Sequence, residues 1–172
     1  DAALREAFRK VSELGVPVAV HAEDKTLLSK NEAQLKQANR HDIAAFLKAH
    51  SEHVELNAIK RLLHINAQAN ANLHFCHLTT KEGLEAVIEA KKAGGNVTCE
   101  VTPHHLLLSD SDFERYGPTL ITMPPIRSRR HIEALWQGIA DGWIDILGSD
   151  HAPHSLDEKF ASSVWDVKVG LP

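Results

Sequence analysis

Several residue types are scarce in this sequence of 172 residues, and each scarcity excludes a class of protein. Two cysteines, Cys76 and Cys99, are too few for a disulfide framework, so a reducing compartment is expected. No run of about 18 apolar residues is present, which excludes a membrane-spanning helix. The net charge is only −4 and basic residues are not concentrated in a patch, which argues against nucleic-acid binding. We expect a cytoplasmic protein with neither nucleic-acid nor membrane partners.

The abundant residues favour a globular protein with histidine chemistry. Hydrophobic residues make up 43% of the chain, which suffices for one core and excludes a disordered chain. Histidine is unusually frequent, with twelve copies. Because histidine is the commonest metal ligand and titrates near neutrality, this count points to metal binding or acid–base catalysis.

The two ends of the chain carry no start or leader signal. The sequence begins with Asp1 in a helical pattern, contains methionine only at Met123, and stops at Pro172 without a tail. We interpret the chain as an excerpt of a longer protein. A processed secreted domain is the alternative, but no signal peptide supports it.

Hydrophobic periodicity predicts alternating strands and helices. Short apolar runs predict strands over residues 16–20, 73–78, 96–101 and 143–147. Helical spacing predicts helices over 2–14, 54–69, 81–93 and 129–141, interrupted helix across 25–70, and a loop-rich region over 109–128. Strands separated by helices are typical of βα repeats. The predicted fold class is therefore α/β with a parallel sheet.

Every predicted strand ends in ionisable side chains. These are His21, Glu23 and Asp24 after the first strand, His77 at the second, Glu100, His104 and His105 at the third, and Asp150, His151 and His154 after the fourth. Ligands of parallel α/β folds bind at the carboxyl ends of the strands, so these positions predict a metal or catalytic site. Imidazoles with one carboxylate suit zinc, iron, manganese or nickel.

Common motifs of other enzyme classes are absent. The sequence has no paired CxxC, no HExxH helix, no glycine-rich phosphate loop and no GxSxG elbow. Zinc-finger, metalloprotease, nucleotide-binding and serine-hydrolase interpretations therefore lack support.

Four strings carry a family resemblance, and they occur in the family's order: VHAED at 20–24, FCHLT at 75–79, EVTPHHLLL at 100–108 and GSDHAPH at 148–154. Together they resemble the C-terminal half of the barrel in cyclic amidohydrolases, and within these the class I dihydroorotases. VTPHHLLL and SDHAPH favour dihydroorotases over allantoinases and dihydropyrimidinases. The resemblance implies that residues 1–172 form the C-terminal half of a barrel domain, with strands five to eight of a (β/α)₈ TIM-type barrel.

The resemblance also implies roles for individual residues. His21 and His77 would be metal ligands, and Asp150 both a ligand and the general acid/base. His154 would help to hold the substrate's carboxylate. The family's site holds two divalent ions, usually zinc, whose remaining ligands would lie upstream of Asp1. A water that bridges two such ions loses a proton near neutral pH and becomes a nucleophile.

The implied function is that of a metal-dependent hydrolase that opens a small cyclic amide. The leading hypothesis is reversible conversion of dihydroorotate to N-carbamoyl-aspartate in pyrimidine biosynthesis, by a homo-oligomer. An allantoinase or hydantoinase, and an inactive dihydroorotase-like structural partner, are the alternatives. Met123 keeps them open, because the family usually has an asparagine there and a thioether cannot make an amide's paired hydrogen bonds. We also expect the segment to be inactive by itself.

The remaining candidate side chains have structural interpretations. Strand alternation places Cys76 on the face opposite His77, buried against a helix. His104 and His105 are expected to support the site or the fold. Solvated or core positions are expected for His41, His50, His53, His64, His74 and His131.

Overall fold

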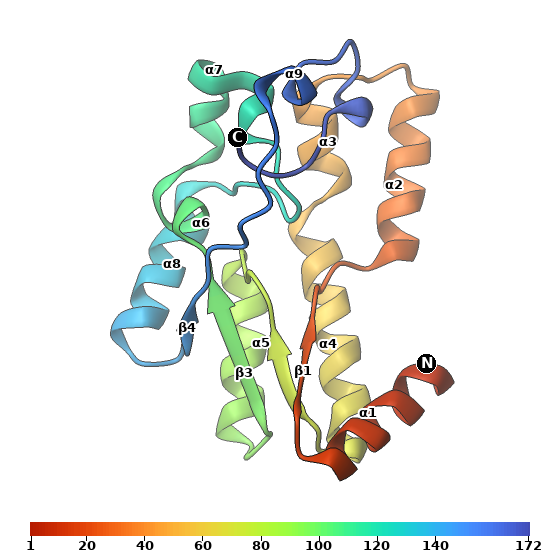
Figure 1. Ribbon diagram of the computed structural model, residues 1–172, viewed down its shortest axis with the longest axis vertical. Coiled ribbons are helices and arrows are strands. Elements are labelled where there is room, and N and C mark those ends of the chain that lie inside the picture. The colour runs from red at the N-terminus through yellow and green to blue at the C-terminus, as the bar shows by residue number, and fades with distance from the viewer.

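A computed structural model describes all 172 residues as one parallel sheet with helices packed against it (Figure 1). The strands are β1 (Pro17–Val20), β2 (Asn72–Phe75), β3 (Val97–Val101) and β4 (Ile146–Leu147), hydrogen-bonded in that order. The longer helices are α1 (Ala2–Leu14), α2 (Lys25–Gln37), α4 (Glu52–Ala69), α5 (Lys81–Lys92) and α8 (Arg129–Ala140). Shorter helices are α3 (Ile43–Ala49), α6 (Pro103–Leu107), α7 (Phe113–Tyr116) and α9 (Leu156–Lys159). The predicted α/β class with parallel βα repeats is confirmed.

One face of the sheet is covered by helices and the other is open. Leu73 and Phe75 on β2 and Cys99 on β3 are fully buried in the main hydrophobic core, and Figure 1 shows α4 and α5 behind these strands. The paired positions His74 and Thr98 lie on the opposite face, where Thr98 is exposed. Sequential parallel neighbours with helices on one side are the arrangement of a barrel segment.

The connections after the strands build a cap over the carboxyl edge of the sheet. In Figure 1 the strands point toward α2, α3, α6, α7 and α9, which lie beyond that edge. The cap has a small core of its own, formed by Phe46, Ile121, Val164 and Val167. The region 109–128, predicted as loop, contains α7 and the 3₁₀ segments 110–112 and 117–120.

The second and fourth strands are shorter than predicted. The expected strand 143–147 is reduced to Ile146–Leu147, because the N–H groups of Trp143 and Ile144 still bond to the Gly138 carbonyl and so continue the turn that ends α8. The expected strand 73–78 stops at Phe75, since His77 turns the chain with a φ of 35°. Hydrophobic runs identify buried segments, but not where the backbone stops pairing.

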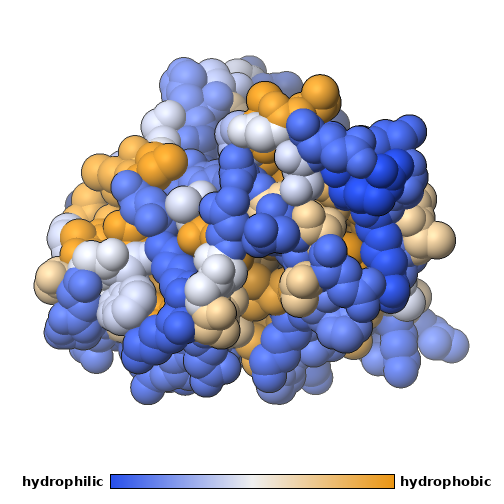
Figure 2. Space-filling model, turned by 90° about the horizontal axis from the view of Figure 1, so that it is seen from below, coloured by the Kyte–Doolittle hydropathy of each residue, from blue (hydrophilic) through white to orange (hydrophobic).

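The surface has no feature of a membrane span. None of the helices is long and apolar enough to cross a bilayer. Figure 2 shows the molecule from below, with hydrophobic patches between hydrophilic side chains. Near this end the turn between α1 and β1 carries the exposed side chains of Leu14 and Val16.

The turn from α4 into β2 is fixed by one buried side chain. Asn66 donates from Nδ2 to the Ala71 carbonyl and accepts from the Ala71 N–H at Oδ1, both at 2.9 Å. Asn70, between them, ends the helix with a left-handed φ of 50°. The side chain of Asn66 therefore replaces the backbone partners that the turn removes.

We expect Asn66→Ala to lower the free energy of unfolding by about 1–3 kcal/mol, because the buried Ala71 N–H and carbonyl lose their partners. Urea unfolding followed by circular dichroism measures the change. Gln68→Ala, at an exposed position of the same helix, is the matched control and should stay within about 0.5 kcal/mol of the parent. Equal shifts for both variants would contradict the role of Asn66.

Candidate metal centre at the carboxyl edge of the sheet

Two histidines from neighbouring strands meet at this edge. His21 directly follows β1 and His77 lies two residues beyond β2, and His21 Nδ1 is 3.1 Å from His77 Nε2. Two nitrogens bound to one tetrahedral zinc at their usual bond lengths are about 3.3 Å apart. The spacing of the two rings therefore fits two imidazole ligands on a single ion.

Glu23 fixes the orientation of His21. Its Oε2 is 3.0 Å from His21 Nε2, and its Oε1 is 2.8 Å from Nδ1 of the buried His50. A proton on Nε2 that is donated to Glu23 leaves Nδ1 of neutral His21 as a bare lone pair facing His77. Burial raises the pKa of Glu23, but the hydrogen bonds from His21 and His50 outweigh it and lower the pKa to about 2. Glu23 is thus a carboxylate at neutral pH.

His77 is held in a strained and buried position. Its φ of 35° lies in the left-handed region, which non-glycine residues seldom adopt and which clusters at functional sites. Burial lowers the pKa of His77, and the neighbouring His21 lowers it further. Its Nδ1 is buried without a hydrogen-bond partner. A neutral imidazole is the form that binds metal ions.

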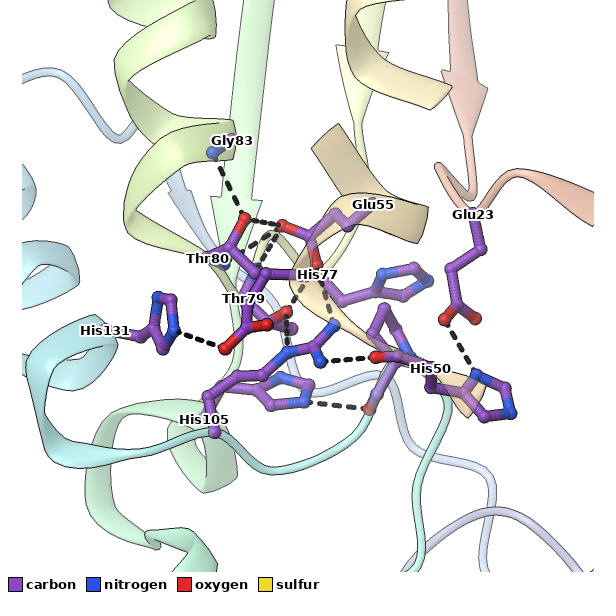
Figure 3. Close-up of polar contacts among 12 residues, drawn as sticks. Glu23, His50, Glu55, His77, Thr79, Thr80, Gly83, His105 and His131 are labelled. Atoms are coloured by element: carbon purple, nitrogen blue, oxygen red, sulfur yellow. Dashed lines mark hydrogen bonds and ion pairs between the residues drawn. The ribbon is translucent and has the colours of Figure 1, made fainter. Parts of the chain in front are cut away.

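A buried carboxylate anchors the turn that follows His77 (Figure 3). Glu55 on α4 accepts the backbone N–H groups of Thr79 and Thr80 at 3.1 and 2.9 Å, and both hydroxyls as well. The Thr80 hydroxyl also accepts the Gly83 N–H and so caps the first turn of α5. The two residues that follow the strained His77 turn, Thr79 and Thr80, are therefore held by one carboxylate.

Arg127 joins this network to the Glu23–His50 pair. Its Nε donates to the Thr79 hydroxyl at 3.0 Å, and its Nη1 donates to the His50 carbonyl. Its Nη2 lies 3.7 Å from a Glu55 oxygen and has no hydrogen bond of its own. The turn after β2 and the region behind His21 are thus connected through one buried guanidinium.

Asp150 lies at the same edge of the sheet, three residues beyond the end of β4 at Leu147. It is exposed, has a φ of 46°, and lines a cavity of about 220 Å³ together with His104, Met123 and His151. Burial lowers the pKa of His77, and the negative charge of Asp150 opposes that shift. The structure therefore brings His21, His77 and Asp150 to one edge, with only the first two in direct contact.

His154 and His105 lie differently from Asp150. His154 Nδ1 is 3.4 Å from Glu158, and the ring is not among the cavity-lining residues, so its substrate-binding role stays a prediction. His105 is fully enclosed, 2.7 Å from the Thr102 hydroxyl and 3.1 Å from the Pro124 carbonyl. Burial lowers the pKa of His105 strongly. His105 is a structural residue, as expected.

The prediction for Cys76 is wrong. Alternation holds from His74 to Cys76, so Cys76 lies on the side of His74 and Glu100 rather than against a helix, and it is His77 that leaves regular strand geometry. One ligand atom from each of these three residues falls within 4.8 Å of the others. Burial raises the pKa of the Cys76 thiol, and the charges of Glu100 and Asp150 raise it further.

His74, Cys76 and Glu100 form a second group of possible metal ligands that the sequence did not predict. His74 Nε2 lies 3.3 Å from Glu100, and its Nδ1 lies 2.8 Å from the Thr98 hydroxyl. Imidazole, thiol and carboxylate together are a donor set that suits zinc. The signal that could have found the group is the shared face of alternate positions on adjacent strands.

Comparisons with known proteins identify relatives of the chain by sequence. No family model matches the sequence. The chain is 38% identical over its whole length to a dihydroorotase of Halobacterium salinarum and 39% identical over 92% of its length to one of Brevibacillus brevis. It is 34% identical to an L-hydantoinase of Paenarthrobacter aurescens over 99% of its length. It spans 37–38% of the length of these relatives.

Solved structures confirm the fold. An L-hydantoinase from Arthrobacter aurescens superposes with a TM-score of 0.94 at 33% identity over 98% of this chain and 38% of its own. A D-hydantoinase from Thermus gives 0.96 at 27% identity over 100% of this chain and 39% of its own. The expected segment of a TIM-type barrel is therefore confirmed.

The comparisons define first a class and then a family. The fold places the chain in a structural class, because it superposes on part of the hydantoinase barrels. Its relatives, which include dihydroorotases and an allantoinase, narrow this: the chain belongs to the cyclic amidohydrolases, as the sequence strings indicated.

We expect Glu55→Gln to lower the free energy of unfolding by about 3–5 kcal/mol, because Arg127 loses its buried counter-charge and the N–H donors of the turn face an amide NH₂. The shift of the urea midpoint measures it. Glu85→Gln, on the exposed face of α5 and 3.8 Å from Lys81, should change stability by at most about 1 kcal/mol. If the shift of the urea midpoint is as small for Glu55→Gln as for Glu85→Gln, Glu55 does not anchor the turn.

Proposed function

We propose that the chain is part of a metal-dependent hydrolase that opens a small cyclic amide, converting dihydroorotate reversibly to N-carbamoyl-aspartate in pyrimidine biosynthesis. The observation that carries this proposal is the 3.1 Å approach of His21 and His77 at the carboxyl edge of the sheet. The two dihydroorotases at 38 and 39% identity support the choice of substrate.

His21, His77 and Asp150 would hold the divalent metal, with two zinc ions in a complete site. When bound, these ions supply an activated water and polarise the ring carbonyl. Glu23 keeps the proton of His21 on Nε2, and burial keeps His77 neutral. The carboxylate of Asp150 would accept a proton from the attacking water and deliver it to the ring nitrogen as the ring C–N bond breaks.

Residues around the cavity next to Asp150 would orient the substrate. His154 can present a ring N–H to the carboxylate of the substrate, although in the present arrangement its Nδ1 faces Glu158. Rotation of the ring away from Glu158 would free this donor. The cavity of about 220 Å³ matches a small ring rather than a polymer.

The proposal assigns residues 1–172 to the C-terminal half of the barrel domain, with the chain's four strands as strands five to eight. The remaining metal ligands would come from the other half, so the segment alone would be inactive. We further propose a cytoplasmic homo-oligomer. The free cysteines Cys76 and Cys99 support the reducing compartment.

A hydantoinase or allantoinase is the second candidate. Met123 lines the cavity with an exposed fraction of 37%, and its thioether offers no amide hydrogen bonds to a substrate. The L-hydantoinase and allantoinase relatives, both at 34% identity over 99% of the chain, support this alternative. An inactive structural partner is the third candidate.

Substrate profiling of the protein with a complete barrel separates these candidates. The loss of ultraviolet absorbance measures the ring opening of dihydroorotate. We expect its kcat/KM to exceed the values for hydantoin and allantoin at least tenfold, which corresponds to about 1.4 kcal/mol of discrimination. Preference for either of the other rings supports the second candidate. Absence of both turnover and bound metal supports the third.

Replacement of His77 tests the metal centre directly. In the complete barrel, His77→Ala should remove bound metal, measured by elemental analysis, together with activity. His64→Ala, at an exposed position of α4, should retain both. Full metal content and turnover in His77→Ala would exclude His77 from the centre.

A further inference from the structure

Lys159, at the end of α9, is a buried cation without a buried counter-charge. Its side chain is fully enclosed, yet no carboxylate lies within salt-bridge distance. Its Nζ donates three hydrogen bonds to backbone carbonyls, at 2.8 Å to Ile121, 2.7 Å to Lys168 and 2.6 Å to Gly170. Lysine is almost never fully buried unless it is paired, so this arrangement requires an explanation.

The three carbonyls come from two segments that are far apart in sequence. Ile121 precedes the turn that contains Met123, whereas Lys168 and Gly170 belong to the last residues of the chain. The Gly170 N–H also donates to the Ile121 carbonyl at 3.0 Å. One ammonium group therefore sits at the junction where both segments meet.

These two segments form adjoining walls of the cavity that Asp150 lines. Thr122 and Met123 of one segment and residues 169–172 of the other are among the residues that line it. The junction has no slack: a Cβ on Gly170 would lie 2.5 Å from the Ala152 carbonyl oxygen. Movement of either segment would change the width of the cavity, because both segments line it.

We propose that Lys159 is a positioning residue that sets the width of this cavity and thereby the affinity for the cyclic-amide substrate, an inference that rests on the proposed function. An ammonium group has three hydrogens, and the three carbonyls accept all of them. Burial lowers the pKa of Lys159 to about 8, so the group still carries its third proton at pH 7. No neutral side chain of similar length offers three donors from one atom.

Lys159→Met tests this role, because methionine keeps the length and loses all three donors. In the complete barrel we expect KM for dihydroorotate to rise at least tenfold while kcat changes less than about threefold, the signature of lost binding rather than lost chemistry. Metal content should stay at the parental value. Amide hydrogen exchange should become faster in residues 120–123 and 168–172.

Lys168→Met is the matched control, since the Lys168 side chain is exposed and makes no hydrogen bond. Its backbone carbonyl still accepts the hydrogen bond from Lys159 Nζ. It should leave KM and exchange unchanged. Lys159→Arg keeps the charge, and its rigid fork should satisfy only part of the carbonyl set. It should raise KM less than Lys159→Met, and it serves as the test if the methionine variant does not fold.

The outcomes separate this inference from the proposed function. Unchanged exchange and KM in both Lys159 variants would overturn the positioning role, and so would a loss of metal or kcat that accounts for the whole defect. If the parent protein opens no cyclic amide, the proposed function fails. In that case, faster amide exchange of Lys159→Met confined to the two walls would still support the positioning role of Lys159, and unchanged exchange would overturn it.

Discussion

The site depends first on the buried carboxylate of Glu55. Four donors from Thr79 and Thr80 converge on it, and Arg127 lies beside it as the counter-charge. A carboxylate can be buried in this way only because its oxygens are saturated with hydrogen bonds. The turn it holds is the one that carries the left-handed backbone of His77. Because strain of this kind persists only where the surroundings over-determine it, Glu55 is what allows His77 to face His21.

Close packing reinforces that electrostatic anchor. Gly83 lies at the point where α4 and α5 touch, and a Cβ there would fall 2.7 Å from the Thr80 hydroxyl and 2.9 Å from Glu55. Only glycine therefore permits α5 to begin so near the carboxylate. From this anchor, contacts through Arg127 and His50 reach Glu23, so both histidines of the pair are oriented by one continuous set of buried polar groups.

The parts of the fold and site that the sequence predicted share a local signal. A polar residue shortly after a hydrophobic run marks the end of a parallel strand, and this signal placed His21, His77 and Asp150 at the carboxyl edge of the sheet without any tertiary information. Glu55 gave no such signal, because a glutamate in the first turns of a helix is an ordinary helix residue. Cys76 was assigned to the wrong face because its position was inferred from His77, whose left-handed backbone breaks the alternation that His74 and Cys76 follow. The short length of β4 was not predicted, because hydrogen bonds to the Gly138 carbonyl compete with strand pairing. Tertiary geometry decides such competition.

The polar lining of the uncovered side of the sheet has a consequence for assembly. His74 bonds Thr98 and Glu100 there, in a position where a barrel interior is commonly filled with branched aliphatic side chains. Any polypeptide that seals this side must bring hydrogen-bonding groups in matching places, or leave buried dipoles unpaired at a cost of several kcal/mol. A counterpart that covers this side must therefore combine polar groups opposite β2 and β3 with apolar groups opposite Ala19 and Ile146.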